Sequence, residues 1–387
     1  MAQRKNIQDD DVQGMKFLRV LNPLLDTLHD HATERDKAGN RNLFFDHYAS
    51  LLILYFFSPA LTSLRAIQQA SNLKKVQKAL GCSRASLGSL SEASRVFDPE
   101  LLRNILGELA QQAVPLVQGK EAEALAQLTA VDGSLLPALP RMAWALWQDE
   151  GHRAAKMHLC FEVFKGIPLD ATLTPGTGSE RNELRRMLQA GRLYVMDRGY
   201  HSYGFFQDII DAEAGFVCRV QNNAAYRVVE TRTITPAAAA AGVIEDVVVD
   251  KLGSDHKKNF IRQPVRVVKV DTGELNDQGG PVLLVLAASE LQLDAELVAL
   301  AYKHRWAIEL FFRWFKCILG CRHLLAHSEN GVTIQVYAAL IASLMISLWI
   351  GRKPTKRTFE MICHYFSGWA DEEELLAHIR TLQRHSA

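Results

Sequence analysis

Two aspartates stand where short apolar runs of β-strand character end. Asp132 follows the run 128–131 and precedes Gly133, and Asp197 follows the run 193–196 and precedes an Arg-Gly pair. A carboxylate at the end of a strand can point into a cleft, although an Asp at such a place most often forms a turn or caps a helix. Because the chain has two such residues, a third acid that could join them would favour the cleft interpretation.

Glu309 is the third acid, and it lies in an aromatic and basic stretch. The apolar residues of this stretch, 302–316, recur at helical spacing. Arg305 stands four residues before Glu309, so the two could form an ordinary i,i+4 ion pair on a solvated helix face. The other interpretation is a helix that faces nucleic acid, and the two strand-end aspartates favour it.

Three carboxylates together suit chemistry at a phosphodiester. Hydrolysis or transfer requires a water or a 3′-hydroxyl to lose a proton and the charge on the leaving oxygen to be neutralised. Two Mg²⁺ ions about 3.5–4 Å apart perform both tasks, and hard divalent ions prefer carboxylate ligands. Asp132, Asp197 and Glu309 are therefore predicted to be catalytic and to bind two Mg²⁺ ions, for which Mn²⁺ can substitute.

A second group of metal-ligand residue types falls within eleven residues of the chain. It consists of Cys317, Cys321, His323 and His327. The cysteine spacing differs from that of a zinc knuckle, and buried free cysteines usually act as small hydrophobic side chains, which is the favoured interpretation here. The six cysteines are scattered and the first ten residues lack the apolar core of a signal peptide, so the sequence predicts a cytoplasmic protein with reduced thiols.

The length and net charge of the chain limit the number of domains but leave its binding partner open. The chain has 387 residues, is 48% hydrophobic, and carries 44 Lys and Arg against 43 Asp and Glu. This size permits about two or three domains with a large buried core. Because the net charge neither indicates nor excludes nucleic acid, any DNA surface would have to be a local patch.

Residues 1–125 are predicted to form a helical, DNA-binding region. Apolar residues recur at helical intervals over 17–28, 43–57 and 64–80. Gly81 ends the last of these, and a further helix over 84–96 gives the outline of a helix-turn-helix, with Arg84 and Arg95 expected to contact DNA. The same outline fits any two short helices joined at a glycine.

From residue 126 the pattern changes to strands, and the fold class expected is α/β. The first part of the core, 126–221, is expected to hold an antiparallel meander, a polar helix over 182–190 and a strand that ends at Asp197. A β-rich insertion follows over 222–295. Its basic residues form either solvated surface or a DNA contact. They are Lys251, Lys257, Lys258, Arg262, Arg266 and Lys269.

The second part of the core, 296–350, ends in a long apolar segment. Residues 332–351 approach the length of a membrane span, but polar residues interrupt them, and a buried central helix is the favoured interpretation. Residues 351–387 are expected to be helical. The segment 371–382, acidic and then basic, is a candidate contact between two copies of the chain.

The stretch 302–316 resembles a known signature. Tyr302, Arg305, Glu309 and Lys316 have the spacing of the Y-R-E-K signature of bacterial cut-and-paste transposases of the insertion-sequence-four family, a group with a DDE triad and a retroviral-integrase or ribonuclease-H fold. Residues 131–134 and 195–200 resemble the two catalytic-Asp regions of that family, and residues 156–159 resemble its second strand. The resemblance extends over residues 126–327.

The resemblance implies roles for individual residues. Asp132, Asp197 and Glu309 would be the metal-binding triad. Contacts to transposon-end DNA would come from the signature and from the second Asp region, through Tyr302, Arg305, Trp306, Lys316, Arg198 and Tyr200. Residues 222–301 contain no tryptophan, so base flipping by an insertion-domain tryptophan is not carried over.

The expected architecture is a ribonuclease-H-like mixed sheet with flanking helices, interrupted by a β-rich insertion, between helical N- and C-terminal regions. The resemblance implies a nucleoid-associated transposase that nicks double-stranded element ends, forms and opens a hairpin, and transfers strands into target DNA as a homodimer or larger assembly, with no membrane partner. Two alternatives stay open: a catalytically silent transposase-derived DNA-binding protein, and a ribonuclease-H-like nuclease without strand transfer.

Overall fold

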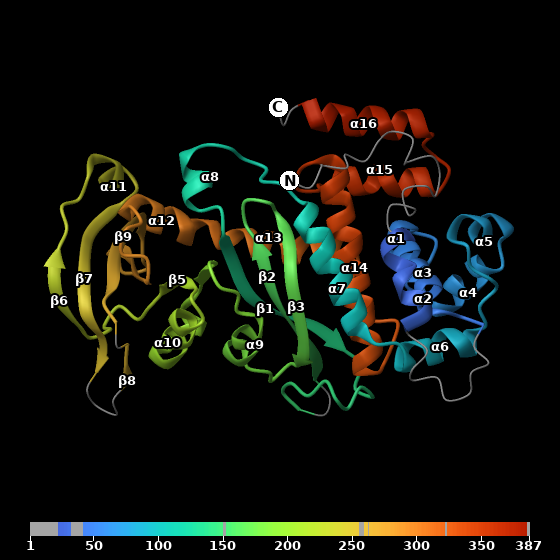
Figure 1. Cartoon of the computed structure of the whole chain (residues 1–387), viewed down its shortest axis with the longest axis horizontal. Coiled ribbons are helices and arrows are strands. Elements are labelled where there is room, and N and C mark those ends of the chain that lie inside the picture. The colour runs from blue at the N-terminus through green and yellow to red at the C-terminus, as the bar shows by residue number, and fades with distance from the viewer. Residues whose placement is uncertain are drawn as a thin grey trace.

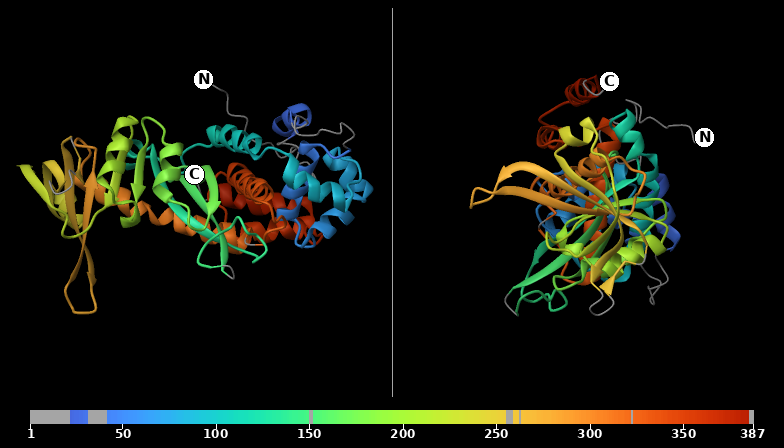
Figure 2. Two further views of the ribbon diagram at one scale, coloured as in Figure 1. Left: turned by 90° about the horizontal axis from the view of Figure 1, so that it is seen from below. Right: turned by 90° about the vertical axis from the view of Figure 1, so that its left-hand side faces the viewer.

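The fold is seen in a computed structural model that describes residues 22–31, 42–149, 152–254, 259–261, 263–321 and 323–384. The molecule is elongated, with a mixed sheet at its centre (Figure 1). The N-terminal helices lie at one end of the long axis and the outer strands of the insertion lie at the other (Figures 1 and 2). The central strands therefore lie between the N-terminal helices and the outer strands of the insertion (Figure 1).

Five strands, counted inwards from the edge strand β3 and called the central strands because of their place in the molecule, have the order β3-β2-β1-β4-β5. Their bounds are β1 Leu128–Ala138, β2 Arg153–Glu162, β3 Ile167–Pro175, β4 Leu193–Met196 and β5 Gly215–Arg219. β1, β2 and β3 are antiparallel neighbours, whereas β4 runs parallel to both β1 and β5. The predicted meander and the predicted fourth strand are confirmed.

The insertion continues this sheet, because β10 (Pro281–Ala288) pairs antiparallel with β5. β9 (Val265–Leu275), β7 (Val243–Ser254) and β6 (Tyr226–Thr231) follow in that order, and β8 (Asn259–Phe260) pairs with β7. The hairpin of β9 and β10 projects from the body (Figure 2). The alanine run of the insertion forms the short helix α11 (Pro236–Ala240).

The expected basic edge of the insertion is only partly present. Arg266 is 3% exposed and forms a bidentate ion pair with Asp246, which is 4% exposed, so this arginine belongs to the core and cannot contact DNA. Lys269 pairs with Glu245 at 2.8 Å, and Lys251 lies over the ring of Phe260. The other three basic residues, Lys257, Lys258 and Arg262, lie outside the described residues.

Helices cover both faces of the central strands. α9 (Glu180–Met187) and α10 (Tyr203–Asp211) cover one face, where Val131 and Met196 are buried against them. α7 (Pro99–Gln112) and α14 (Glu329–Ile350) cover the other face and contact β3. Since successive side chains of a strand point to opposite faces, Asp132 points to the face opposite Val131.

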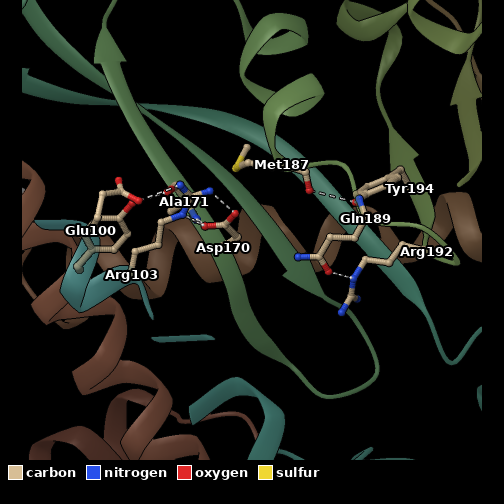
Figure 3. Close-up of polar contacts among 9 residues, drawn as sticks. Glu100, Arg103, Asp170, Ala171, Met187, Gln189, Arg192 and Tyr194 are labelled. Carbon is tan, nitrogen blue, oxygen red and sulfur yellow. Dashed lines mark hydrogen bonds and ion pairs between the residues drawn. The ribbon is translucent and has the colours of Figure 1, made fainter. Parts of the chain in front are cut away.

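Polar contacts link α7 and the segment that follows α9 to the sheet (Figure 3). Arg103 of α7 donates two hydrogen bonds of 2.7 Å to Asp170 of β3 and also pairs with Glu100. The hydroxyl of Tyr194 in β4 accepts from the backbone of Gln189 at 2.9 Å. A bidentate Arg–carboxylate pair has a defined geometry, so α7 is held in one register on β3.

α14 is the predicted buried central helix. Most of its residues are buried, and it packs against α7 and against α3 (Phe45–Phe57). By length and apolar composition alone this one helix could cross a membrane, yet 89% of its most apolar window is buried inside the protein. A helix that is apolar all round is explained by this central position.

The N-terminal region is helical where it is described. Its elements are α1 (Asn22–Leu25), α2 (Thr27–His31), α3, α4 (Leu64–Ser71), α5 (Lys74–Leu80), α6 (Leu87–Val96), α7 and, before the sheet, α8 (Lys120–Ala124). The start of the helix predicted over 17–28 lies outside the described residues. The single helix predicted over 64–80 is wrong, because Leu73 takes an extended backbone conformation between α4 and α5.

The predicted helix-turn-helix outline corresponds to α5, a turn and α6. Gly81 ends α5 in the left-handed conformation with φ 65°. Ser86 caps α6 by accepting a hydrogen bond from the backbone of Ser89. Arg84, before α6, and Arg95, in its last turn, are exposed, so both remain candidates for DNA contact.

Two helices complete the chain, α15 (Lys356–Phe366) and α16 (Glu372–Arg384), which contact each other above α14 (Figure 1). Leu375 and Ile379 of α16 are buried. The apolar face of the segment predicted to join two chains is therefore used within one chain, and only its polar face is available to a second copy.

Candidate active site

Asp132 and Asp197 lie side by side where β4 ends beside β1. In the parallel pair, Leu128 is in register with Leu193 and Ala130 with Val195. Continuing that register by two residues brings Asp132 beside Asp197. β4 ends at Met196, directly before Asp197, whereas β1 continues to Ala138 and Asp132 is in register with Leu159 of β2. The prediction that Asp132 ends a strand is therefore wrong, but the parallel pairing of β1 with β4 still brings together two carboxylates that are far apart in the sequence.

The electrostatics of Asp132 agree with this placement. Burial raises the pKa of its carboxyl to about 6, and the neighbouring carboxylates of Asp197 and Glu180 raise it further. The backbone N–H of Gly133, which donates to it at 2.8 Å, and the charge of Arg305 act in the opposite direction. The strand ends therefore carry an excess of negative charge in a half-buried place.

Asp197 is held by its own backbone and by β5. Its side chain accepts a hydrogen bond of 2.8 Å from the backbone of Gly199 and so caps the short 3₁₀ helix η3 (Arg198–Tyr200). Its carbonyl accepts from the thiol of Cys218 at 3.1 Å. The capping role that is common for such an aspartate is thus present together with the position beside Asp132.

The stretch 302–316 is not the single regular helix that was predicted. It comprises the end of α12 (Ala295–His304), α13 (Trp306–Arg313) and the π-helical segment η5 (Trp314–Ile318). Hydrogen bonds tighten at Arg305, whose N–H donates to Tyr302, three residues back. The residue spacing of the hydrogen bonds lengthens after α13, where the N–H of Leu319 donates to the carbonyl of Trp314, five residues back. π-helical turns are frequent at functional sites because they change the direction of side chains.

Glu309 lies on α13, which contacts β1, but its carboxylate is turned toward Arg305. The Oε1 atom of Glu309 is 2.7 Å from Nη2 of Arg305. The i,i+4 ion pair that the sequence allowed is therefore present, and the contact of Arg305 with transposon-end DNA stays a prediction. Repulsion by Asp132 and Asp197 and attraction by a cation four residues away both favour this arrangement.

The three acids do not close into one compact ligand group here. Within the part of the chain that the structure describes, the group of three ligand atoms within 4.8 Å of one another is a different one, formed by His29, Asp46 and His47.

Tyr302 and Lys316, two further residues of the spacing that resembles the Y-R-E-K signature, lie near these aspartates. Both are half-buried. Burial lowers the pKa of Lys316, while the charge of Asp132 raises it, so the ammonium group lies near that carboxylate. The hydroxyl of Tyr302 is within electrostatic reach of Arg305, Arg219 and Asp197. The signature residues thus gather at the strand ends.

The remaining predicted DNA contacts differ in accessibility. Trp306 is 60% exposed, and the guanidinium of Arg305 lies 5.6 Å from its ring. Arg198 is exposed. Tyr200 is 2% exposed and packs beside Phe205 in the core, so the prediction that it contacts DNA is wrong. Its position directly after an exposed Arg-Gly pair gave no sign of this burial.

Arg84 and Arg95 lie in the N-terminal helical region, away from the strand ends. Arg95 is within electrostatic reach of His327, which Arg141 contacts at 2.6 Å. Of the four residues of the zinc alternative, Cys321 is buried in the core and Cys317 is exposed. Because Arg84 and Arg95 lie in the N-terminal helices, any DNA that they contact would be a different part of the duplex from the part at the carboxylates.

Glu180 is a site residue that the sequence did not indicate. It begins α9, forms an ion pair of 3.4 Å with Lys156 of β2, and contributes to the raised pKa of Asp132. A Cβ atom at Gly133 would lie 2.6 Å from Oε1 of Glu180. The glycine after Asp132 therefore makes room for Glu180, a close approach that has no signature in the sequence.

Arg219 is the second such residue. The register of β4 with β5 pairs Met196 with Cys218, so its continuation brings Arg219 beside Asp197. The Nε atom of Arg219 is buried and has no hydrogen-bond partner among the described residues. Its position at the end of a parallel strand was the available signal, and an unpaired guanidinium nitrogen at this edge is suited to an anionic group.

These residues fit divalent cations. A half-buried carboxyl whose pKa is raised by burial and by two other carboxylates is one whose ionised form a cation would stabilise. Carboxylate oxygens are the ligands that Mg²⁺ and Mn²⁺ prefer. Asp132 and Asp197 could hold such ions directly, and Glu309 could join them by leaving Arg305.

Glu180→Gln should shift the pH dependence of any metal-assisted reaction at this site. Asp132, with a pKa of about 6, takes up a proton as the pH falls through 6, and a protonated carboxyl binds cations poorly. The substitution removes one charge that raises this pKa. We expect the acid limb of the pH–rate profile, measured at limiting Mg²⁺, to move to lower pH.

The matched control for this shift is Glu274→Gln, on the exposed end of β9. That substitution removes the same charge far from the site and should leave the profile in place. An unchanged acid limb in Glu180→Gln would contradict the placement of Glu180 beside Asp132.

The part of the chain that contains Asp132, Asp197 and Glu309 is similar to a known protein family. Residues 123–345 match the family described as the transposase DDE domain. This region contains the whole central sheet, the insertion and the signature stretch. Members of that family generally use divalent metal ions.

Three relatives illustrate the range of similarity. The y4zB transposase homologue of Sinorhizobium fredii is 28% identical over 228 residues, which is 58% of this chain and 62% of that protein. A protein described as a transposase for the insertion sequence element IS5377 of Geobacillus stearothermophilus is 24% identical over 59% of each chain. One described for the element IS4SA of a Synechocystis species is 22% identical over 86% of this chain and 89% of that protein.

The match thus spans less than two thirds of the first two relatives. Among solved structures, the piggyBac transposase in a synaptic complex with hairpin DNA has a TM-score of 0.44 and 10% identity, covering all of this chain and 88% of that one. This likeness is too distant to assign a property to the present protein. On the family match, which covers more than half of its residues, the chain belongs to the transposase DDE domain family.

Proposed function

We propose that the protein is a DNA transposase that cleaves the ends of an insertion sequence and joins them to target DNA. The observation that carries this proposal is the register of β1 and β4, which brings Asp132 beside Asp197 at one sheet edge with Glu309 on a helix against β1. The strand order 3-2-1-4-5, with strands 1, 4 and 5 parallel, supports a ribonuclease-H-like core. Family membership supports the same reaction class.

The carboxylates and the cations around them would divide the work. Asp132, Asp197 and Glu309 would hold two Mg²⁺ ions, which when bound would activate a water or a 3′-hydroxyl and neutralise the leaving oxygen. Arg219, Lys316 and Tyr302 line the same edge and would bind the phosphates on either side of the scissile bond. The exposed Trp306 and Arg198 would contact the DNA further from the reacting phosphate.

Arg305 would change partners when DNA and cations arrive. It now neutralises Glu309 at 2.7 Å. Positive charge beside Glu309 would free the guanidinium, and a phosphate would offer it an equivalent bidentate partner. We infer that, before DNA binds, Arg305 neutralises the negative charge of Glu309 on α13.

The reaction sequence that we propose is of the cut-and-paste type. Water first hydrolyses one strand at the element end and leaves a 3′-hydroxyl. That hydroxyl then attacks the opposite strand, which gives a hairpin and releases the flanking DNA. Water opens the hairpin, and the regenerated 3′-hydroxyl attacks a target phosphodiester. Two element ends must be joined, so at least two chains would act together.

Strand transfer from pre-nicked element ends tests this function. The protein is incubated with Mg²⁺, a target plasmid and DNA ends that already carry the free 3′-hydroxyl, and products are resolved on a denaturing gel. We expect joined molecules. A nuclease would degrade DNA without joining, and a silent DNA-binding protein would retain the ends without altering them, so either result would reject the proposal.

Arg305→Ala and Lys316→Ala should weaken the binding of element ends by a similar, modest factor. Each removes one phosphate contact, so each should lower the slope of log Kd against log salt by about 1. Electrophoretic mobility shifts over a range of salt concentrations measure this slope. Lys303→Ala, on the exposed side of α12, is the control that should leave the slope unchanged.

A further inference from the structure

A second group of potential metal ligands lies in the N-terminal region, where α2 meets α3. His29 is on α2, and Asp46 and His47 are in the first turn of α3. Nδ1 of His29 is 2.9 Å from Oδ2 of Asp46, and Nε2 of His47 is 3.5 Å from the same oxygen. One ligand atom from each of the three residues lies within 4.8 Å of the other two.

These separations suit a small tetrahedral ion. Zinc lies about 2.0–2.1 Å from imidazole nitrogens and carboxylate oxygens, so ligand atoms around it are about 3.3 Å apart. The two measured separations lie on either side of that value. Only small movements would therefore be needed to close the three side chains around an ion.

Burial of the central carboxylate provides independent support. Asp46 is 8% exposed, and its second oxygen, Oδ1, is buried without a hydrogen-bond partner among the described residues. An ion pair with His29 alone leaves that oxygen unsatisfied, which is costly in a buried place. A cation shared by both carboxylate oxygens would satisfy it.

The surroundings also orient the ligands. The ring of His29 stacks on Phe44 with centroids 4.0 Å apart, which fixes the imidazole against α3. Cys82 is buried close enough for the charge of Asp46 to act on its thiol. Two imidazoles and a carboxylate, with a thiolate or water as fourth ligand, suit zinc rather than magnesium.

We propose that His29, Asp46 and His47 bind one zinc-class divalent ion that fastens α2 to α3. This site is separate from the carboxylate edge in position and in ligand chemistry. It would be structural, because it ties a five-residue helix to the apolar helix α3 in the region predicted to contact DNA. A short helix has little stability of its own, so one such link would decide whether α2 stays docked.

Metal binding by the full-length Asp132→Asn protein tests the proposal, because this background weakens the catalytic cation site. Chelator-stripped protein is titrated with Co²⁺ and with Zn²⁺. We expect about one ion per chain, visible d–d absorption of tetrahedral Co²⁺ that Zn²⁺ displaces, and a higher melting temperature with Zn²⁺. DNA cleavage plays no part in these readouts, so they stand independently of the proposed function.

Matched substitutions locate the ion. His29→Gln and His47→Gln should each weaken binding by more than the roughly 10- to 100-fold that loss of a supporting contact costs. His152→Gln is the control, because His152 and Asp149 form an exposed pair at the same 2.9 Å; it should leave affinity unchanged. Circular dichroism verifies that each variant is folded.

Two results would overturn the proposal. One is no stoichiometric Co²⁺ or Zn²⁺ binding by the folded Asp132→Asn protein. The other is undiminished binding by both folded glutamine variants, which would place the ion elsewhere.

Discussion

Asp132→Asn is expected to abolish metal-dependent DNA cleavage and, at the same time, to raise the melting temperature of the metal-free protein. The first effect follows from the proposed role of Asp132 as a charged metal ligand at the reacting phosphate. Removing one preorganised electrostatic group from an active site typically costs about 100- to 1,000-fold in rate. A cation ligand shared by two ions should cost at least that much.

The second effect follows from the raised pKa of Asp132. An acid whose pKa is about 6 in the folded protein and about 3.9 in the unfolded chain binds more protons when folded. The folded state therefore loses stability as the pH rises through this range, and above about pH 6 the full cost is present. Asparagine carries no charge, so at pH 7.5 with chelator the variant should gain on the order of 2 kcal/mol.

Below about pH 4 this gain should disappear, because Asp132 is then protonated in both states. Asp250→Asn is the control, since Asp250 forms an exposed ion pair with Arg227 on the insertion; it should cleave DNA normally. A metal-free Asp132→Asn protein that melts at or below the wild-type temperature at pH 7.5 would contradict the electrostatic account of the site.

Glu309→Gln should abolish cleavage while leaving the binding of element ends intact. Glutamine keeps the shape and can still accept a hydrogen bond from Arg305, but it lacks the charge that a divalent ligand needs. The substitution also weakens the hold of Glu309 on Arg305, so phosphate binding should not suffer. Nicking of supercoiled plasmid and mobility shifts of end DNA measure the two properties separately.

Glu360→Gln is the matched control for this effect. Glu360 forms an i,i+4 ion pair with Lys356 on α15, as Glu309 does with Arg305 on α13. Loss of such a pair alone should change neither nicking nor binding. Normal nicking by Glu309→Gln would remove Glu309 from the triad.

The pairing of Asp132 with Asp197 could be expected from the sequence because the strands that carry them have local sequence patterns. Short apolar runs before an aspartate mark the start of β1 and all of β4, and parallel pairing then brings the two aspartates together. The continuation of β1 to Ala138 was not predicted. The insertion was also recognisable from alternating strands, although pairing of β10 with β5 makes it an extension of the central sheet.

Features that depend on burial or on distant partners were not predictable. Arg266 and Lys269 look alike in sequence, yet Arg266 is buried on Asp246 while Lys269 stays near the surface. Tyr200 follows two exposed residues and is nonetheless in the core. The close approach of Glu180 to Gly133 has room because that residue lacks a side chain.

Backbone irregularities were missed for a related reason. Helical periodicity continues through 64–80 and 302–316, but it does not record where hydrogen bonds shift from one spacing to another. The break at Leu73 and the π-helical turn that carries Lys316 leave no mark in the spacing of the apolar residues. The group formed by His29, Asp46 and His47 likewise arises from the docking of α2 on α3.

Cleavage of a plasmid that carries the DNA flanking this reading frame is the most direct test of the central claim. Wild-type protein is compared with Asp132→Asn, Asp197→Asn and Glu309→Gln in the presence of Mg²⁺ or Mn²⁺ and in chelator. We predict cuts at the element ends by the wild type only, and only with a divalent ion. Cleavage that persists in any of the three variants, or that proceeds equally in chelator, would contradict the three-carboxylate metal site.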